Sequence, residues 1–299
     1  MKVFYHTDND GFLSAALVAN FKPQKADMKY VPINYDKPFP MDDIEEGEEV
    51  WILDYHIPPE QMDVLLDRTR NVVWIDHHET AIKKYQAYQM SVEKLPIKGI
   101  RDVRLAGCAL TWLYILGYTV NQYFAMPKLD EYPKVIDLVD NWDTWGHGSG
   151  PNLQAKLFNA GSQIHDTEPT GAFWKECLSV TGNKITTTIQ EGAIVTAYKK
   201  QHAEEYCKAS LCWADLDGYR CAILNIGMAG RDWFESVCAN HVDIFVTIVF
   251  NGEKWLCTLY SNSPEIHVGE IAKGYGGGGH PGAAGFECET LPFEFGVRK

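Results

Sequence analysis

The stretch NVVWIDHH, residues 71–78, runs from a set of apolar side chains directly into an acid and two histidines. Asn71–Ile75 is rich in branched and aromatic residues, which predicts a buried strand. Asp76, His77 and His78 follow at the strand's carboxyl end, where α/β sheets bind ligands. Buried imidazoles and carboxylates are costly unless something satisfies them. The stretch therefore predicts a polar site at a sheet edge, although a His pair alone can also be a hydrogen-bonded feature of a core.

The rest of the N-terminal part predicts partners for this strand. Apolar runs at Val3–Tyr5, Lys29–Asn34 and Glu49–Leu53 have the character of strands, and they are separated by helical patterns at Gly11–Asn20 and Pro58–Arg70. Strands that are apolar throughout and alternate with helices are typical of a parallel sheet covered on both faces.

Beyond this region the predicted secondary structure changes twice, first to helices and then back to strands. Helical patterns occur at Leu105–Leu116, at Tyr132–Val139 and twice within residues 171–210, and the last, roughly Lys184 to Ala209, resembles a connector. Strand patterns return at Arg220–Asn225, Ile244–Phe250 and Lys254–Ser261, with a hairpin turn at Asn251-Gly252. We expect an α/β protein with three parts: an N-terminal parallel-sheet domain with flanking helices over 1–185, a helical linker over 186–210, and a smaller mixed α/β domain over 211–299.

Composition limits the class of protein. The chain has 299 residues, 45% of them hydrophobic, and a formal net charge of −13. Proteins that coat long DNA usually carry a basic surface, so the charge argues against that function but leaves a short oligonucleotide or a small phosphorylated nucleotide open as substrate. No apolar run approaches the ~20 residues of a membrane helix, and the start MKVFYHTDND does not resemble a signal peptide. These features predict a cytoplasmic protein with no membrane partner. The scattered cysteines form no CxxC pair, which favours reduced thiols over structural zinc.

A second polar cluster follows the first strand. His6, Asp8 and Asp10 alternate, so in an extended segment they would face one site, and Gly11 would then let the chain turn into a helix. The sequence DNDG is also typical of an ordinary turn.

Two further acidic segments could complete the cluster. Asp54 follows the third strand, where it could equally cap a helix. Asp140 and Asp143 lie in LVDNWDTW, which could also be a plain helix terminus. Carboxylates combined with imidazoles suit manganese or magnesium, and the histidines favour manganese. Two such ions ~3.5–4 Å apart would clamp the oxygens of a phosphoryl displacement and lower the pKa of a bridging water.

In order and approximate spacing these residues resemble a known family. HTDNDG at 6–11, Asp54, DHH at 76–78 and the Asp140 segment are similar to the four motifs of the DHH phosphoesterase superfamily, and GGGGHPGAAGF at 276–286 resembles the signature of its DHHA1-type C-terminal domain. The DHH triplet and the glycine-histidine motif are specific, whereas Asp54 and the Asp140 segment are not. The likeness is strongest to the oligoribonuclease and cyclic-nucleotide phosphodiesterase branch.

The resemblance implies roles for individual residues. One manganese would be held by His6, Asp8 and Asp54, and a second by Asp10, Asp54, His77 and Asp140, with Asp54 bridging and Mg²⁺ as a possible substitute. Asp76 and His78 would be catalytic, Asp76 by orienting a ligand and His78 by lying near the substrate phosphate. The alignment is ambiguous by three residues in the last motif, so Asp143 is the alternative to Asp140.

The glycine-histidine motif predicts a phosphate grip. Glycines let the backbone approach a ligand and let consecutive N–H groups point at one anion, although a glycine run can also be a hinge. The resemblance implies that Gly277, Gly278, Gly279 and His280 bind the terminal nucleotide or phosphate of a substrate across an interdomain cleft.

One departure from the family concerns the strand before this motif. Relatives often carry an arginine there, but this chain has Thr258-Leu259-Tyr260-Ser261. Arg231 is a candidate replacement, or else a solvated charge at a helix start. Tyr260 could instead stack on a base.

Together these features predict a manganese-dependent phosphodiesterase acting on short RNA oligonucleotides or related small nucleotides. The alternatives are a phosphatase of 3′-phosphoadenosine 5′-phosphate and a catalytically silent nucleotide sensor. The filled ligand positions argue against the sensor. A homodimer is compatible with the sequence.

Overall fold

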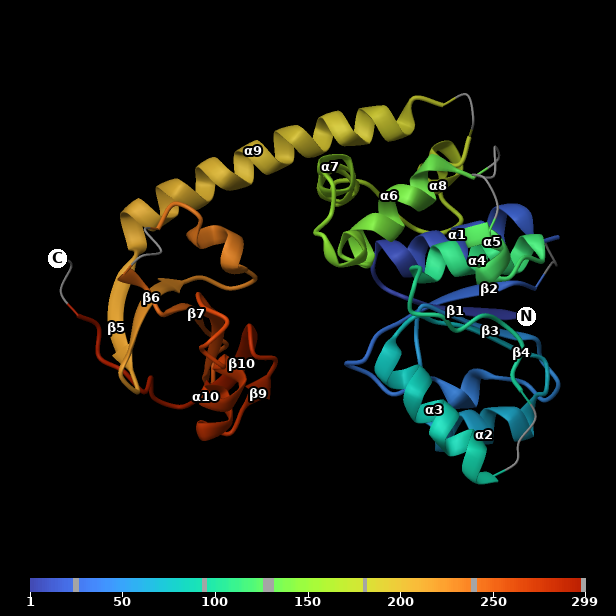
Figure 1. Cartoon of the computed structure of the whole chain (residues 1–299), viewed down its shortest axis with the longest axis horizontal. Helices are drawn as coiled ribbons and strands as arrows, with labels where there is room; N and C mark the ends of the chain where they lie inside the picture. Colours follow the sequence, from blue (N-terminus) through green and yellow to red (C-terminus); the bar gives the residue numbers. More distant parts are fainter. Residues whose placement is uncertain (24–26, 93–95, 126–131, 180–181, 238–240, 297–299) are drawn as a thin grey trace. The chain divides into compact units, whose positions relative to one another are not determined.

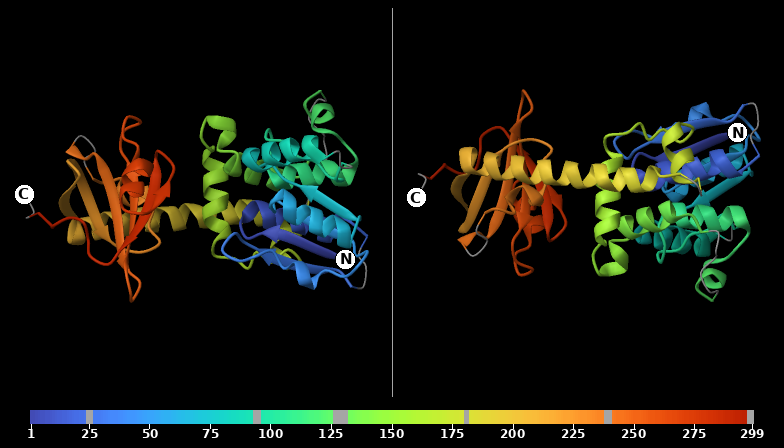
Figure 2. Two further views of the ribbon diagram at one scale, coloured as in Figure 1. Left: turned by 90° about the horizontal axis from the view of Figure 1, so that it is seen from below. Right: turned by 90° about the horizontal axis from the view of Figure 1, so that it is seen from above.

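The computed structural model describes residues 1–23, 27–92, 96–125, 132–179, 182–237 and 241–296. The chain forms two compact units, Met1–Val195 and Thr196–Lys299, and the division falls within helix α9 (Lys184–Ser210) (Figure 1). The predicted linker, 186–210, belongs to this helix, which is seen as one unbroken helix in the right view of Figure 2. The predicted domain limits themselves stay a prediction.

The first unit is built on a parallel sheet, as predicted. Its strands lie in the order β2-β1-β3-β4 and every neighbouring pair is parallel. The strands are β1 (Lys2–His6), β2 (Lys29–Ile33), β3 (Val50–Leu53) and β4 (Val72–Ile75). Because all four run the same way, the chain leaves β1, β3 and β4 at one common edge.

Helices cover both faces of this sheet (Figure 1). Alternate strand residues face opposite sides: Val3 and Tyr5 belong to one apolar core, and Phe4 belongs to the other. The first core includes residues of α1 (Asn9–Phe21), α4 (Gly107–Leu116) and α6 (Lys134–Asp143), and the second includes residues of α2 (Pro59–Arg68) and α3 (Glu79–Val92). Burying each large apolar side chain stabilises such a core by roughly 1.5–3 kcal/mol.

Several elements were not predicted from the sequence. In the first unit they are α3, α5 (Val120–Ala125), α7 (Leu153–Ser162) and the 3₁₀ turns η1 (Met41–Asp43) and η2 (Gly146–Gly148). In the second unit they are η3 (Arg231–Phe234), β5 (Cys212–Leu216), α10 (Val268–Gly274), β9 (Gly278–Gly279) and β10 (Ala283–Cys288). Helix α8 (Ala172–Cys177) corresponds to the first helical pattern within 171–210. The extended segment 97–102 was also missed, and it pairs with the outer edge of β4: Trp74 N–H donates to Lys98 O (2.9 Å) and Asp76 N–H to Ile100 O (3.2 Å).

The second unit contains a mixed sheet in the order β5-β6-β7-β8-β10-β9, with one parallel pair, β6 and β7. Its elements are β5 (Cys212–Leu216), β6 (Tyr219–Asn225), β7 (Ile244–Phe250), β8 (Trp255–Ser261), α10 (Val268–Gly274), β9 (Gly278–Gly279) and β10 (Ala283–Cys288). The hairpin predicted at Asn251-Gly252 is confirmed, since Asn251 N–H donates to Lys254 O and Gly252 has a φ of +103°.

Two further observations on the described residues concern membrane-spanning helices and cysteines. None of their helices combines the length and the apolar character that crossing a membrane requires. Seven cysteines are free thiols, most of them buried, and Cys238 lies outside the described residues.

Helices α7 and α9 approach closely at two glycines within the first unit. A Cβ on Gly161 would lie 2.0 Å from Thr188 O, and one on Gly192 would lie 1.8 Å from Leu157 O. No side chain fits between backbones at that distance, so glycine is required at both positions.

We predict that Gly192→Ala lowers the free energy of unfolding by about 1–3 kcal/mol, because the added methyl forces the two helices apart. Gln190→Ala, on an exposed position of the same helix, should change it by no more than about 0.5 kcal/mol. Urea unfolding of the full chain measures both. Equal stability of the two variants would contradict this packing.

Candidate metal centre

Acid and imidazole side chains from separate segments meet at the carboxyl edge of the parallel sheet. Among the described residues, four groups have ligand atoms within 4.8 Å of one another and could each hold a cation, and two of them include residues of α1 or its cap: His6, Asp8 and Asp54, and Asp10, His77 and Asp143. Each of these two groups takes a residue from the end of a strand and another from helix α1 or its cap. The fold therefore gathers residues that are far apart in the sequence, as the strand ends predicted.

The first group is organised by the start of α1. His6 Nδ1 lies 2.8 Å from Asp8 Oδ2 and 3.6 Å from Asp54 Oδ2. Asp8 is the N-cap of α1, and its Oδ1 accepts a hydrogen bond from Gly11 N–H (2.9 Å). The predicted extended conformation of 6–10 is therefore wrong beyond Asp8, because this cap starts the helix at Asn9 and places Asp10 in the first turn.

Gly11 has a different role from the predicted one. It lies inside α1 and does not have a positive φ. A Cβ at this position would lie 2.1 Å from His6 O. The glycine is needed because α1 starts in contact with the end of β1, and not because the chain turns sharply there.

The second group surrounds His77. Its Nε2 lies 3.1 Å from Asp143 Oδ2, 3.3 Å from Asp54 Oδ1 and 3.7 Å from Asp10 Oδ2. His77 thus faces one carboxylate from α6, one from the end of β3 and one from α1. This geometry can supply both nitrogen and oxygen ligands to a single divalent cation.

Asp54 joins the two groups. One carboxylate oxygen faces His77 and the other faces His6. The residue is 1% exposed, and neither oxygen has a well-aligned hydrogen bond from the described residues. Its backbone has a φ of +52°, in the left-handed region that L-residues rarely adopt. A buried carboxylate in this state is costly unless cations satisfy it, so the donor set fits two divalent ions bridged by Asp54.

The N-terminus of α4 supports the acids, a feature that sequence reasoning missed. Gly107 and Cys108 donate their N–H groups to the two oxygens of Asp10, at 2.6 and 2.7 Å. A Cβ on Gly107 would lie 2.8 Å from Asp54 Cβ and 2.9 Å from Asp10 Oδ2. The small residues of LAGCA, 105–109, were the available signal, since only small side chains allow this approach.

The segment of α6 contains Asp140 and Asp143, and the sequence left open which of the two is the metal ligand. Helix α6 continues to Asp143, so Asp140 does not end the helix as expected. Asp140 Oδ1 accepts from Ala106 N–H (2.6 Å), and its Oδ2 lies 3.1 Å from His147 Nε2. Asp143 is the residue that contacts His77. The geometry thus favours the alternative, Asp143, as the acid nearest the second cation site.

Asp76 and His78 form a pair beside the cation sites. His78 Nδ1 donates to Asp76 Oδ1 at 2.6 Å, and the same oxygen accepts from the N–H groups of His77 (2.8 Å) and His78 (3.2 Å). Asp76 is fully buried. It therefore holds the imidazole of His78 in one orientation, as expected of an orienting acid. His56, which sequence reasoning did not select, lies with this pair, and its Nδ1 is 2.8 Å from Tyr35 Oη.

The electrostatics show how strongly the site favours cations. Burial and then the neighbouring carboxylate of Asp54 hold the pKa of Asp10 well above its usual value, and burial also raises the pKa of Asp54. Pairing with Asp54 and Asp8 raises the pKa of His6 to about 10. Burial lowers the pKa of His77, but pairing with Asp143 and Asp54 outweighs it and raises the pKa to about 12. Without metal, these pKa shifts favour protonated imidazoles beside the carboxylates.

The glycine-histidine motif lies in the second unit and differs from the expected anion cradle. Gly277 N–H donates to Ala272 O (2.9 Å) and His280 N–H to Ala283 O (2.8 Å), while Gly278 and Gly279 form β9. The expected run of N–H groups directed at one anion is therefore not available at Gly277 and His280, whose N–H groups bond to the protein's own carbonyls. A Cβ on Gly277 would lie 2.1 Å from Gly285 O, so this glycine serves close packing against β10. The exposed side chain of His280 remains available to a ligand.

Arg231 and Tyr260 also lie in the second unit. Arg231 is exposed in η3, and its Nη2 donates to Asn262 Oδ1 at 3.0 Å. Tyr260 is half-buried and donates its hydroxyl to Ala229 O at 3.2 Å. Arg231 thus has a defined position near the end of β8.

Comparison with known proteins agrees with this architecture. No protein-family model matches the chain, and no curated protein matches it significantly. Among solved structures, the pGpG-specific phosphodiesterase PggH of Vibrio cholerae is 16% identical and aligns with a TM-score of 0.56 over 96% of this chain and 93% of its own. A DHH domain from a protein described as a member of a ribosomal protein family is 12% identical, with a TM-score of 0.59 over 98% of this chain and 82% of its own. The chain therefore shares the fold of these two solved structures, one of which is a DHH domain, so the resemblance seen in the sequence holds at the level of the fold.

Metal binding should release protons. At pH 7 the imidazoles of His6 and His77, with pKa values of about 10 and 12 in the metal-free protein, are protonated. They must lose those protons to bind a cation. The apparent affinity for Mn²⁺ should therefore rise with pH across the neutral range.

Calorimetric titration with Mn²⁺ at pH 7, in two buffers of different ionisation enthalpy, measures the protons released. We expect His77→Asn to release fewer protons than the wild type. His202→Asn, on α9 outside the metal centre, should release the same number. Binding without proton release would contradict the protonation state.

The two acids of α6 can be compared directly. Asp143→Asn should weaken binding of one Mn²⁺ by at least about tenfold, because it removes the charge that faces His77. Asp140→Asn should have a smaller effect, since an amide oxygen can still accept the Ala106 N–H. Titration of both variants decides the assignment, and the opposite order would return the ligand role to Asp140.

Proposed function

We propose that this protein is a divalent-cation-dependent phosphoesterase that hydrolyses phosphodiester bonds of short oligonucleotides or small nucleotides. The observation that carries the proposal is Asp54, a buried carboxylate without a well-aligned hydrogen bond whose two oxygens face His77 and His6 in two candidate cation groups. The fold shared with a pGpG-specific phosphodiesterase supports the same class of reaction.

Two cations would be held by His6, Asp8 and Asp54 on one side and by Asp10, Asp54, His77 and Asp143 on the other. Manganese suits this mixture of imidazoles and carboxylates, and magnesium is the alternative. When bound, such ions supply an activated water and stabilise the charge that develops on phosphoryl oxygens.

The chain's own residues complete the chemistry. His78 is fixed through Nδ1 by Asp76, and this hydrogen bond raises its pKa. Its other ring nitrogen can donate to a phosphate oxygen or deliver a proton to the leaving oxygen. The N–H groups of Gly107 and Cys108 hold Asp10 in place during the reaction. Asp76 is a positioning residue, because it acts through His78.

Aromatic side chains near the centre favour a nucleotide over a plain phosphate. Tyr35 is 48% exposed and stacks on Tyr55, with ring centroids 4.4 Å apart, and its hydroxyl bonds to His56. Trp145 follows Asp143 closely, is 61% exposed and has a φ of +53°. Exposed rings of this kind are platforms on which bases stack.

The second unit would recognise the end of the substrate. His280 and Arg231 are exposed there and offer hydrogen-bond donors to an anion. Arg231 can present a guanidinium to phosphate, which compensates for the arginine that this chain lacks in β8. In this proposal the side chains, and not the glycine N–H groups, provide the grip.

The test is Mn²⁺-dependent release of mononucleotides from a labelled dinucleotide, run beside phosphate release from 3′-phosphoadenosine 5′-phosphate. We expect the dinucleotide to be the better substrate. Asp54→Ala should lower turnover by about 10³-fold or more, because it removes the residue shared by both cation groups. Asp42→Ala, which changes a fully exposed acid of the same unit, should retain full activity.

Three outcomes would count against the proposal. Preferred turnover of the monophosphate would make the protein a phosphatase, and tight binding without any turnover would make it a sensor. Full activity of Asp54→Ala would defeat the two-cation centre itself.

A further inference from the structure

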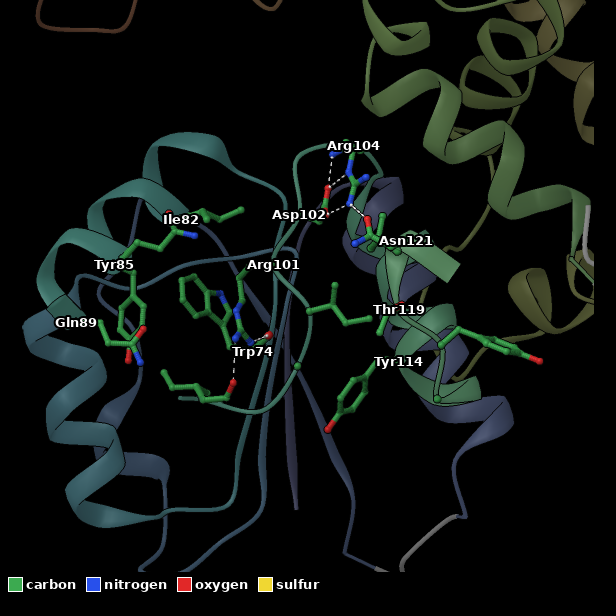
Figure 3. A pocket seen from close by; sticks show the side chains of 17 residues that line it. Trp74, Ile82, Tyr85, Gln89, Arg101, Asp102, Arg104, Tyr114, Thr119 and Asn121 are labelled. Carbon is green, nitrogen blue, oxygen red and sulfur yellow. Dashed lines mark hydrogen bonds and ion pairs between the residues drawn. The ribbon is translucent and has the colours of Figure 1, made fainter. Parts of the chain in front are cut away.

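A cavity separate from the metal centre lies beside the outer edge of the parallel sheet (Figure 3). Its volume is about 600 Å³, which is in the range of small-molecule sites. Its walls come from α3, from the segment 97–104 and from the end of α4 together with the residues up to Asn121. None of the acids or histidines of the two cation groups lines it.

Arg101 supplies a charge to this cavity that the protein does not neutralise. Its Nη1 donates to Trp74 O (2.9 Å) and Lys98 O (3.1 Å), and its Nη2 donates to Ile97 O (2.9 Å). All three acceptors are neutral carbonyls. In the part of the chain that the structure describes, no carboxylate forms an ion pair with this guanidinium. An unpaired, half-buried cation is unusual in a protein with a net charge of −13.

The same hydrogen bonds leave one edge of the guanidinium open. A guanidinium has five N–H donors. The three bonds engage Nη1 and Nη2 only, so Nε–H has no acceptor among the described residues, and Nη2 makes one bond although it carries two N–H groups. Nε and Nη2 lie on one edge of the guanidinium, the side-on edge that binds a carboxylate or a phosphate with two parallel hydrogen bonds.

The neighbouring arginine shows the contrast. Arg104 also lines the cavity, but its Nε and Nη2 donate to the carboxylate of Asp102 at 2.9 and 2.6 Å. The Asp102 carboxylate therefore neutralises the charge of the Arg104 guanidinium. Arg101 therefore supplies the net positive charge of the cavity, and the Asp102 carboxylate is already occupied.

Aromatic walls define the rest of the site. Figure 3 shows Tyr85 on α3 and Tyr114 on α4 on either side of Arg101 and Trp74. The Trp74 ring lies under the guanidinium, 5.5 Å from it. Gln86, an exposed residue of α3, adds an amide at the rim. Flat rings beside a guanidinium fork suit a flat ligand that carries an acidic group.

We infer that this cavity binds a small organic anion, whose phosphate or carboxylate pairs with the open edge of Arg101 and whose flat body lies against the partly exposed ring of Tyr114, while the buried rings of Trp74 and Tyr85 support the guanidinium from below. The site is independent of the cation groups and of the reaction they would perform.

Calorimetric titration of the full chain in EDTA tests the inference without a contribution from metal. The probes are AMP and benzoate, which carry a phosphate and a carboxylate on flat bodies, with adenosine and inorganic phosphate as partial ligands. We expect AMP or benzoate to bind with a Kd below about 1 mM. Adenosine and inorganic phosphate should each bind the site at least about tenfold more weakly, since each lacks one half of the recognition.

Substitutions of residues that line the cavity test whether the ligand binds there. Arg101→Lys keeps the charge but loses the fork, and it should weaken binding by about tenfold or more. Because Arg101 also anchors the segment 97–102, a second variant is needed: Gln86→Trp fills the cavity from an exposed position and should abolish binding. Ala87→Trp, an exposed neighbour that does not line the cavity, is the matched control and should bind as the wild type does. Undetectable binding of both anions, adenosine binding as tightly as AMP, or unchanged binding by Gln86→Trp would each overturn the inference.

Discussion

The buried carboxylate of Asp54 is the constraint around which the N-terminal unit is arranged. It is 1% exposed, its backbone has a left-handed φ of +52°, and its two oxygens face the imidazoles of His6 and His77. An isolated carboxylate in this environment would cost several kcal/mol. The surrounding elements reduce that cost only in part, by bringing two imidazoles to it. The remaining need for positive charge makes the place suited to cations.

Close packing keeps this arrangement in place. Glycine at 11 lets α1 begin in contact with the end of β1, and glycine at 107 lets α4 begin in contact with Asp54 and Asp10. The N–H groups at the start of α4 then hold both oxygens of Asp10. A helix N-terminus favours negative charge, so it stabilises the carboxylate without neutralising it. Asp10 is thus held by backbone groups and not by flexible side chains.

The first unit carries positive charge at two sites, and the source of the charge differs between them. At the candidate metal centre, protons on His6 and His77 supply positive charge that a bound metal would replace. At the outer edge of the sheet, Arg101 carries a permanent charge that three carbonyls orient but do not cancel. The two sites share β4: its end supplies His77, and its outer edge bears the segment that carries Arg101. One strand thus separates two regions of distinct chemistry.

The sequence by itself determined the parallel sheet, the mixed C-terminal sheet and the gathering of His6, Asp8, Asp10, Asp54 and His77 at one edge. These follow from local signals, because an apolar strand that ends in an acid places that acid at the carboxyl edge whatever the loops do. Only the tertiary structure decided that Asp143 contacts His77 while Asp140 turns to Ala106 and His147. Residues 140 and 143 lie on adjacent turns of one helix, so spacing cannot distinguish them, and the packing of α6 against α4 does. The tertiary structure also decided the partners of Gly277, His280 and Arg101, because the folded backbone conformation, and not the residue type, selects which carbonyl a backbone N–H or a guanidinium bonds.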